Sequence, residues 1–487
     1  MDGVNPRFDV TGPVPPLAEL GRVHLVAIGG AGMSAVARLL LARGVAVTGS
    51  DVADGPALDA LRAAGAERID VGHDASHVSG ADTVVISSAI GEDNVEVAAA
   101  RAAGMPVLHR SQALASLMAD DHRVAVAGAN GKTTTTAMLV VGLVAAGADP
   151  SYAAGAEIAQ LGTNAAVGSG RSFVVEADES DGSFLVYRPH VAVVTNVQPD
   201  HLDFYGTAAR VVEAYEAFAD SVPADGLLVA CHDDPGARAL AARARAGGRR
   251  VVTFGYDGGA DLRVTHTRSE GLGTSSTLER DGTEAALDLL VPGRHNVLDA
   301  CAALLAAVDG CGADVTAVLE GLAGFTGARR RFEVRGEVDG VTVVDDYAHN
   351  APKVAALVGT AAEIVRRAGR GRLHVVFQPH LYSRTRDFAA EFAAALAPAD
   401  DVVLLDVYGA REAPMHGITS ELVGAPLRAL PGERVVEVGL APEAAVAHVV
   451  AAAGPGDLVL TVGAGDVTRL GPLLLDGLAA RAGGARR

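Results

Sequence analysis

The segment AGANGKTTTTAM, residues 127–138, has the composition of a phosphate-binding loop. Gly128 and Gly131 allow a tight turn in which backbone N–H groups point inward, and Lys132 and Thr133 follow at the start of an expected helix. A helix N-terminus favours phosphate, the lysine reaches the terminal phosphates, and the threonine hydroxyl holds magnesium. The loop is shorter than the standard pattern, because only two residues separate Gly128 from the Gly-Lys pair. The residues predicted to contact a nucleotide are Gly128, Ala129, Asn130, Gly131, Lys132, Thr133 and Thr134. The loop alone does not identify the reaction.

Two further expected strands end in side chains that suit a metal site. The run VVEADESD carries Glu176 at the end of an apolar stretch, and TNVQPDHLDFYG places His201 in a polar loop. Magnesium prefers carboxylate oxygen and phosphate, and a histidine ligand is less usual. The residues by themselves leave two interpretations open, which are a metal site and a solvated acidic turn.

Side chains that suit a base and a small carboxylate lie further along the chain. Asn296 opens an expected helix, where it suits reading a base edge and capping the helix equally well. Arg330, in ARRRFE, suits a phosphate clamp or a solvated basic turn. His349 and His380 each stand just past an expected strand, and Arg384 follows the second. Together these three would suit a small carboxylate, although each histidine alone is more often a surface residue.

The N-terminal run VHLVAIGGAGMS is close to a dinucleotide-binding fingerprint. Gly30, Ala31 and Gly32 lie in a glycine turn between an expected strand and an expected helix, and Asp51 ends the next strand about twenty residues on. This arrangement predicts a pyrophosphate site. It does not separate a nicotinamide dinucleotide from a UDP-sugar.

The elements that position these residues form three α/β blocks. We expect a Rossmann-like domain over 1–119, a P-loop-type domain over 120–326 and a second Rossmann-like domain over 327–487. Residues 256–290 are polar and strand-like, which predicts an antiparallel insertion in the central parallel sheet. Because ligands of open parallel sheets bind at the carboxyl ends of the strands, the polar strand ends are where we expect chemistry.

The composition excludes several classes of protein. A chain of 487 residues needs two or three domains, and its net charge of −19 argues against a broad nucleic-acid surface. Cys231, Cys301 and Cys311 match no zinc spacing and no disulfide framework, which predicts a cytoplasmic protein. The first residues carry no signal pattern, and no apolar run is long enough to span a membrane. Lysine is almost absent, since only Lys132 and Lys353 occur.

Taken in order, the motifs resemble the Mur ligases over nearly the whole chain. They are GANGKTTTTAM, VVEADESDGSF, TNVQPDHLDFYG, GRHNVLDACAA, RRFE, DDYAHN and FQPHLYSRTRDF. Longer stretches are similar to the branch of the family that adds alanine to UDP-N-acetylmuramate. They are IGGAGMSAVARLLL with VTGSD, VISSAIGEDNVEVAAARAAGMPVLHR, EADESD, and FQPHLYSRTRDF with LDVYGAREAP.

The resemblance implies a mechanism and roles for the residues. ATP phosphorylates the muramate carboxylate, and the amine of L-alanine attacks the acyl phosphate. Two Mg²⁺ ions would be held with the ATP phosphates by Thr133, Glu176 and His201, and Lys132 would offset the repulsion between anions. Asn296 would contact adenine and Arg330 the phosphates. The amino acid would be held by His349, His380 and Arg384. The UDP-sugar would be bound by Gly30, Ala31, Gly32, Ser50, Asp51 and Ser88.

The chain departs from the family pattern at several positions. Ala129 and Asn130 stand where this branch usually has Thr-His, Asp299 stands for an asparagine, and Leu381 stands for an arginine. AHNAP also replaces the usual Gly-His-His-Pro. No lysine lies between residues 132 and 353, which excludes the carbamylated lysine that several Mur ligases carry.

Four alternatives therefore stay open. The amino acid could be glycine or serine, or a whole peptide could be added, although FQPHLYSRTRDF argues against a peptide. A nicotinamide dehydrogenase would leave the lysine loop unexplained. A P-loop ATPase without ligation would leave the third domain's strand-end residues unused. The protein is expected to be a monomer or a homodimer.

Overall fold

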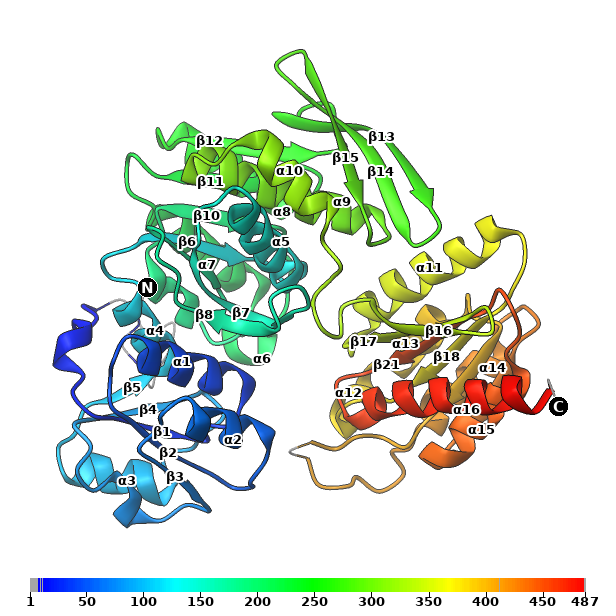
Figure 1. Cartoon of the computed structure of the whole chain (residues 1–487), viewed down its shortest axis with the longest axis horizontal. Helices are drawn as coiled ribbons and strands as arrows, with labels where there is room; N and C mark the ends of the chain where they lie inside the picture. The colour runs from blue at the N-terminus through cyan, green and yellow to red at the C-terminus, as the bar shows by residue number, and fades with distance from the viewer. Residues whose placement is uncertain (1–7, 9, 11, 411, 486–487) are drawn as a thin grey trace. The chain divides into compact units, whose positions relative to one another are not determined.

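The computed structural model describes residues 8, 10, 12–410 and 412–485, and this part of the chain contains three separate β-sheets (Figure 1). The N-terminal residues considered for a signal pattern lie partly outside the described residues, as does Arg411 of the LDVYGAREAP stretch. The α/β class with three domains is confirmed, and each sheet falls within one of the three predicted ranges. The first two sheets belong to one compact unit and the third to another. The domain boundaries themselves stay predictions.

The N-terminal sheet has five parallel strands in the order β3-β2-β1-β4-β5. The strands are β1 (Val23–Val26), β2 (Val47–Asp51), β3 (Arg68–Val71), β4 (Thr83–Ile86) and β5 (Val107–His109). The connecting helices are α1 (Ala31–Ala42), α2 (Pro56–Ala63), α3 (Val95–Ala102) and α4 (Arg110–Leu117). Every residue of β1 and β4 is buried, as expected for central strands of a parallel sheet covered on both faces.

The central sheet has ten strands in the order β15-β14-β13-β12-β11-β10-β6-β9-β7-β8. Strands β6 (His122–Ala127), β9 (Ser172–Glu176) and β10 (Val191–Val194) are parallel neighbours, with β6 in the middle. They lead into the lysine loop, the acidic motif and the loop of His201, so the three motifs leave the same edge of the sheet. The expected antiparallel insertion is confirmed by the pairing of β14 with β15, whereas the antiparallel pair β7–β8 was not expected.

The remaining elements of the central domain flank these strands. The other strands are β7 (Ser151–Ile158), β8 (Thr163–Ala166), β11 (Leu227–Cys231), β12 (Val251–Gly255), β13 (Leu262–Glu270), β14 (Gly273–Arg280) and β15 (Thr283–Leu289). The helices are α5 (Lys132–Ala145), α6 (Leu202–Tyr205), α7 (Ala208–Asp220), α8 (Pro235–Ala246), α9 (Arg294–Leu305) and α10 (Val315–Ala323). Helix α5 packs against α9 and α10, which places the start of α9 beside the lysine loop.

The C-terminal sheet has six strands in the order β16-β17-β21-β18-β19-β20. The strands are β16 (Glu333–Val338), β17 (Val341–Asp346), β18 (Leu373–Phe377), β19 (Asp401–Leu404), β20 (Val435–Val438) and β21 (Leu458–Val462). All pair in parallel except β16, whose antiparallel pairing with β17 was not expected. The helices are α11 (Ala351–Ala368), α12 (Tyr382–Asp387), α13 (Ala389–Leu396), α14 (Glu421–Ala429), α15 (Pro442–Ala452) and α16 (Leu470–Ala485).

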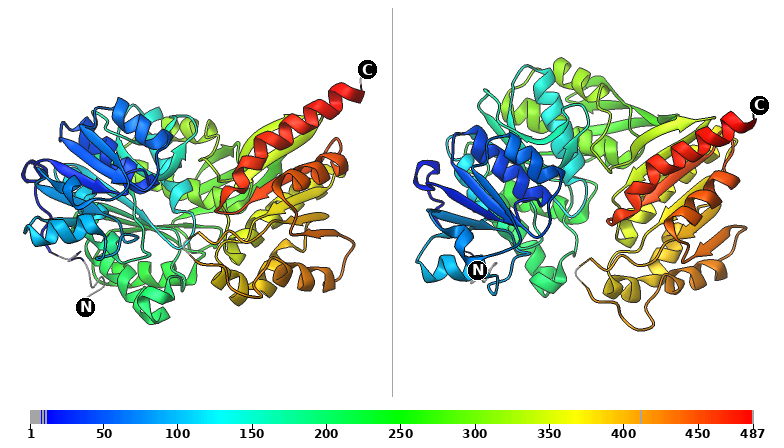
Figure 2. Two further views of the ribbon diagram at one scale, coloured as in Figure 1. Left: turned by 90° about the horizontal axis from the view of Figure 1, so that it is seen from below. Right: turned by 60° about the horizontal axis from the view of Figure 1, so that its bottom comes forward.

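Alternating residues of the C-terminal strands build two cores, one on each face of the sheet. Val375 and Phe377 of β18 pack with α11, α13 and α14, whereas Val376 packs with α15 and α16. Figure 2 shows these helices on opposite sides of the sheet. This period of two is what an apolar strand with both faces covered requires. Among all the described helices of the protein, none combines the length and hydropathy needed to cross a membrane.

The C-terminal sheet contains a buried charged cluster of His374, Asp401 and Asp457. His374 is fully buried, and its two ring nitrogens lie 2.9 Å from Asp401 and 2.9 Å from Asp457. Burial disfavours charge on His374, but the hydrogen bonds to the two carboxylates outweigh burial and raise its pKa. Burial also opposes ionisation of Asp401 and Asp457, yet their hydrogen bonds lower both pKa values.

Replacing His374 by glutamine should therefore lower the free energy of unfolding of this unit by about 3–5 kcal/mol near pH 6, because two carboxylates stay buried without their cation. The contribution of protonated His374 is complete below pH ~6.5 and is lost as the pH rises through its raised pKa. Calorimetry between pH 5.5 and 9 should thus show the gap between wild type and variant narrowing at alkaline pH. His448→Gln, which changes a half-buried partner of Asp401, is the control. A gap independent of pH would contradict the charged state of His374.

Candidate active site

The lysine loop has a backbone that only glycine fits at two positions. Gly128 has φ 141°, and a Cβ there would lie 1.9 Å from Thr195 Oγ1. Gly131 has φ 84° directly before α5, and a Cβ there would lie 2.5 Å from Asp299 Oδ1 on α9. The predicted turn and helix are therefore present, and at these two glycines the chain approaches the loop after β10 and helix α9 too closely for any side chain.

The middle of the loop is held by the end of β10. The Asn130 N–H donates to Asn196 Oδ1 at 2.9 Å, and Asn196 Nδ2 donates back to the Asn130 carbonyl at 2.9 Å. Thr195 Oγ1 donates to the same carbonyl at 2.6 Å. These bonds fix the loop through the backbone of Asn130, so the usual histidine side chain is not needed to shape it. Sequence reasoning did not single out Thr195 or Asn196, although both follow an apolar strand directly.

Lys132 lies on a buried carboxylate. Its Nζ donates to the Gly128 carbonyl at 2.7 Å and lies 2.8 Å from an oxygen of Glu179. Burial disfavours the charge of Lys132, but the carboxylates of Glu179 and Asp178 outweigh burial and raise its pKa. Burial raises the pKa of Glu179. Lys132 is therefore held as a cation beside the loop. It could exchange its contact with Glu179 for a contact with phosphate.

Each of the four acids of the EADESD motif contacts different residues. Both oxygens of Glu176 accept hydrogen bonds, one from Thr133 Oγ1 at 3.0 Å and one from the Gly155 N–H at 2.7 Å. Glu179 pairs with Lys132. Asp178 and Asp181 face the N-terminal domain, where Asp178 lies 3.2 Å from Arg110 and Asp181 accepts from Ser88 Oγ. These four acids, the acidic hub, are therefore partnered side chains and not a solvated turn.

His201 approaches these acids from the loop after β10. It lies directly before α6 with φ 53°, and its Nε2 is 3.7 Å from a Glu179 oxygen. About a third of its side chain is exposed. Among the described residues, no group of three or more His, Cys, Asp and Glu side chains is arranged to hold a metal ion by itself. Any cation here would need phosphate or water oxygens as well, which is the usual situation for magnesium.

Changing Glu179 to glutamine tests the hub. The variant keeps the shape of the side chain but removes the charge that positions Lys132, so we expect the rate of ATP turnover to fall by about 10- to 100-fold. Asp178→Asn is the matched change on the neighbouring acid and should have the smaller effect, since Asp178 pairs with Arg110. Phosphate release measures both. Equal losses would show that the acidity of the motif matters and not the Lys132–Glu179 pair.

The predicted base-binding residue Asn296 lies in the first turn of α9 and is buried. Asp299, which stands for the family's asparagine, is buried one turn further along, and its oxygen lies against Gly131. Both residues therefore belong to the wall beside the lysine loop. This placement does not decide between helix capping and base reading for Asn296, which the sequence favoured equally.

The predicted UDP site is shaped by the turn between β1 and α1. The Gly29 N–H donates to Asp51 Oδ2 at 2.8 Å, and Gly30 precedes α1, whose first residue is Ala31. A Cβ at Gly32 would lie 3.5 Å from Arg110 Nη1. The free N-terminus of α1 and the guanidinium of Arg110 thus face the same turn, which suits an anion. Arg110 is a residue that sequence reasoning missed.

Two predicted UDP-binding serines have other partners in this structure. Ser50 is fully buried and donates to Glu96 Oε2 at 2.6 Å. Burial opposes ionisation of Glu96, but hydrogen bonds from His24, Ser50 and other neighbours lower its pKa to about 2. Ser88 lies 3.0 Å from His109 Nε2 and donates to Asp181. Direct contact of the Ser50 hydroxyl with a ligand would require rearrangement, whereas Ser88 links the first domain to the acidic hub.

The C-terminal domain brings three predicted residues together. His349 and His380 have ring centroids 5.8 Å apart, and Arg384 Nη1 lies 3.4 Å from the His349 carbonyl. His349 Nδ1 is 3.0 Å from the Tyr347 carbonyl, which can only accept, so Nδ1 carries the proton. Burial, with Arg384 nearby, lowers the pKa of His349 to about 3. The imidazole is therefore neutral, and its Nε2 is a hydrogen-bond acceptor.

Leu381 and Arg330 take part in the framework of this domain. Leu381 has φ 70° and donates its N–H to the Tyr408 carbonyl at 2.9 Å. The Arg330 guanidinium donates to the carbonyls of Gly463 at 2.5 Å and Gly465 at 3.2 Å and lies over the Tyr347 ring. These contacts hold Arg330 at the end of β21. Its predicted contact with ATP phosphates stays a prediction.

Three family models match the chain one after another. They are "Mur ligase family, catalytic domain" over residues 22–122, "Mur ligase middle domain" over 126–307 and "Mur ligase, glutamate ligase domain" over 330–465. The chain therefore belongs to the Mur ligase family. It is an ATP-dependent ligase that forms amide bonds.

The similar proteins point to one member of this class. The UDP-N-acetylmuramate–L-alanine ligase of an Arthrobacter species is 55% identical over 472 residues, which are 97% of this chain and 98% of that protein. The ligase of the same name from Kineococcus radiotolerans is 54% identical and covers 97% of this chain and 100% of its own length. The crystal structure of UDP-N-acetylmuramate–alanine ligase from Thermotoga maritima superposes with a TM-score of 0.79 at 30% identity, covering 94% of this chain and 99% of that one.

Proposed function

We propose that this protein joins L-alanine to the carboxylate of UDP-N-acetylmuramate and converts ATP to ADP and phosphate, as a step in peptidoglycan precursor synthesis. The observation that carries the proposal is the identity above 50% over nearly the full length with relatives that bear this name. The lysine loop, the acidic hub and the Arg384 cluster each supply a part that this reaction needs.

A free carboxylate is a poor acyl donor, so it must first be activated. One oxygen of the muramate carboxylate attacks the γ-phosphorus, and the bond to the ADP oxygen breaks, which gives an acyl phosphate. This step brings several anions together, and Lys132 is placed to offset their charge by exchanging Glu179 for phosphate. The amine of alanine then attacks the carbonyl carbon, loses a proton, and phosphate leaves with the electrons of the broken C–O bond.

Magnesium fits the residues at the acidic hub. Thr133 Oγ1 and the Glu176 carboxylate already lie 3.0 Å apart, which joins a hydroxyl and a carboxylate oxygen in the donor set that magnesium prefers. We infer that Thr133, Glu176 and His201 hold two Mg²⁺ ions together with the ATP phosphates. The ions would supply charge neutralisation on the transferred phosphoryl group.

The amino acid is proposed to bind in the C-terminal domain with its two ends recognised separately. Arg384 offers a guanidinium for the carboxylate. Neutral His349 offers Nε2 as an acceptor, which suits the ammonium group rather than the carboxylate. We therefore place the amine near His349 and its neighbour His380, and the carboxylate on Arg384. This division of roles differs from the shared carboxylate site expected from the sequence.

Other features support the setting of the reaction. Cys231, Cys301 and Cys311 are all free thiols, which supports a cytoplasmic location. The net charge of −19 gives no support to nucleic-acid binding. The protein is proposed to act as a monomer or a homodimer.

The test of the proposed function is phosphate release from ATP with each substrate omitted in turn. Turnover should require UDP-N-acetylmuramate and an amino acid together, and L-alanine should be preferred over glycine, L-serine and an alanyl peptide. Preference for glycine or serine would show that the Leu381 departure has altered the amino-acid site. Turnover without the sugar nucleotide would overturn the ligase function itself.

A further inference from the structure

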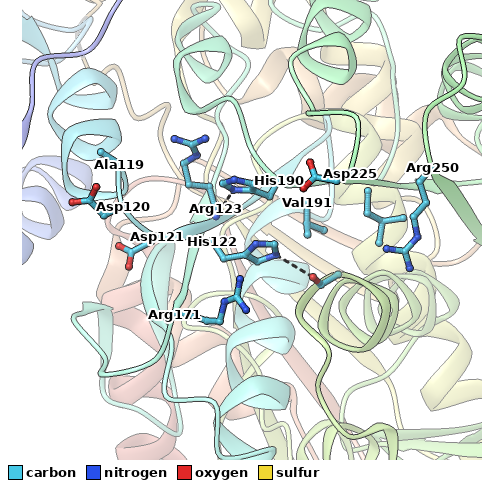
Figure 3. A pocket seen from close by; sticks show the side chains of 13 residues that line it. Ala119, Asp120, Asp121, His122, Arg123, Arg171, His190, Val191, Asp225 and Arg250 are labelled. Carbon is cyan, nitrogen blue, oxygen red and sulfur yellow. Dashed lines mark hydrogen bonds between the residues drawn. The ribbon is translucent and has the colours of Figure 1, made fainter.

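A cavity of about 470 Å³ lies at the edge of the central sheet opposite to the lysine loop. It is lined by the residues at which several parallel strands begin, among them His122 and Arg123 of β6, Arg171 before β9, His190 before β10 and Arg250 before β12 (Figure 3). None of these residues has a role in the ligase reaction described above. Strand β6 is six residues long, which separates the cavity from the loop by ~20 Å.

Among the described residues, the arginines of this cavity have no carboxylate partners. No ion pair is formed by Arg123, Arg171 or Arg250 within the described parts of the chain. Arg123 Nε is in addition buried without any hydrogen-bond partner there. Burial and then the charge of Arg188 lower the pKa of Arg123, which shows that its cation lies in an unfavourable position. A buried guanidinium without a counter-ion costs free energy, and an anion in the cavity would lower that cost.

Two stacked imidazoles add a hydrogen-bond donor to the same cavity. The rings of His122 and His190 have centroids 5.0 Å apart with an angle of 22° between their planes. The Arg123 N–H donates to His190 Nδ1 at 3.1 Å, so the proton of neutral His190 is on Nε2. His122 Nε2 donates to the Gly310 carbonyl at 3.0 Å. Figure 3 shows Arg123 beside His190 and Arg171 beside His122, with Arg250 on the other side of the cavity.

Three aspartates also line the cavity, but they do not neutralise it. Asp121 is paired with Arg43 at 3.2 Å. Asp120 and Asp225 are exposed at its rim, where solvent screens their charge. Among the described residues, these carboxylates therefore leave Arg123, Arg171 and Arg250 without an ion pair.

We propose that this cavity binds a phosphorylated small molecule, with the phosphate on Arg123, Arg171 and His190. Phosphate matches the set because it accepts hydrogen bonds on several oxygens at once and forms bidentate pairs with guanidinium groups. The cavity exceeds the size of inorganic phosphate, and its volume lies in the range of sites for small organic ligands. Arg250 and the rim would contact the organic part. The site is independent of the ligase reaction and should not compete with ATP.

Isothermal titration calorimetry of the full-length protein tests this site with inorganic phosphate, glycerol phosphate and malonate as probes. The double variant Arg171→Ala/Arg250→Ala removes two exposed side chains and should fold normally, as its thermal unfolding will show. Its affinity for glycerol phosphate should fall at least about tenfold relative to wild type. Arg210→Ala/Arg238→Ala, which removes two exposed arginines outside the cavity, should bind like wild type.

Lys132→Ala separates this site from the lysine loop and should retain the binding that the cavity variant loses. Unchanged affinity in the cavity variant would overturn the proposal, as would binding that disappears in Lys132→Ala. Malonate binding as strong as that of glycerol phosphate would overturn the assignment to a phosphate ligand. Loss of ligase activity in any variant bears on the proposed function and not on this site.

Discussion

Replacement of Lys132 by alanine is expected to reduce ATP turnover by about 10³-fold or more, which is the range found when one cationic group is removed from a phosphoryl-transfer site. The physical reason is that Lys132 is placed to meet the charge on the transferred phosphoryl group, while Gly128 and Gly131 fix the loop around it. Lys132→Arg should also be impaired, because a planar guanidinium is not the compact point charge that the loop surrounds. Activity within tenfold of wild type in the alanine variant would overturn the assignment of this loop as the ATP phosphate site.

The scarcity of lysine gives this prediction a direct physical readout. Only Lys132 and Lys353 occur in the chain. A protein labelled at the lysine side chains should therefore give two signals in NMR spectra from the Cε groups adjacent to Nζ. The Lys132 signal should titrate above the usual lysine range in the free protein, since carboxylates raise its pKa against burial. It should shift on addition of ATP, as Glu179 is exchanged for phosphate. A Lys132 signal that does not shift on addition of ATP would contradict the exchange of Glu179 for phosphate.

Replacement of Arg384 by alanine is expected to raise the KM for L-alanine by about 10- to 100-fold, which corresponds to the loss of charged hydrogen bonds to a carboxylate. The KM values for ATP and the sugar nucleotide should change little. Arg386→Ala is the matched control, because Arg386 lies two residues on, is exposed and pairs with its neighbour Asp387 at 2.6 Å. Initial rates against alanine concentration measure both variants. An effect of Arg386→Ala equal to that of Arg384→Ala would remove Arg384 from the amino-acid site.

The strand ends could be predicted from the sequence because each motif follows an apolar run directly. Lys132 and His201 follow β6 and β10, Glu176 ends β9, and the sheet order makes these three strands neighbours. The same rule placed His349 and Arg384 in one domain. Local sequence patterns were sufficient here, since the carboxyl ends of parallel strands necessarily share one edge.

What the sequence could not supply are the pairings between distant residues. Glu176 was the acid of VVEADESD that the sequence favoured, and the contact of buried Glu179 with Lys132 is seen only in the structure. Ser50 was expected at the ligand surface, yet its hydroxyl lies on Glu96, which is 46 residues away. The neutral state of His349 depends on burial, and its tautomer depends on the Tyr347 carbonyl. Each depends on tertiary packing that no periodicity records.

The phosphate cavity was missed for a different reason. Sequence reasoning examined the ends of parallel strands where ligands usually bind, and the cavity lies where the strands begin. His122 and His190 are 68 residues apart and become a stacked pair only because β6 and β10 are neighbours in register. In the sequence neither histidine differs from an ordinary polar residue at the start of a strand.

During the reaction, a carboxylate oxygen of the muramate should be transferred to phosphate through an acyl phosphate. UDP-N-acetylmuramate labelled with ¹⁸O in both carboxylate oxygens tests this transfer directly, with mass spectrometry of the released phosphate and of the amide product. Attack on the γ-phosphorus followed by expulsion of phosphate predicts one ¹⁸O atom in each phosphate and one in each amide. Phosphate without label, or label in AMP, would contradict the account.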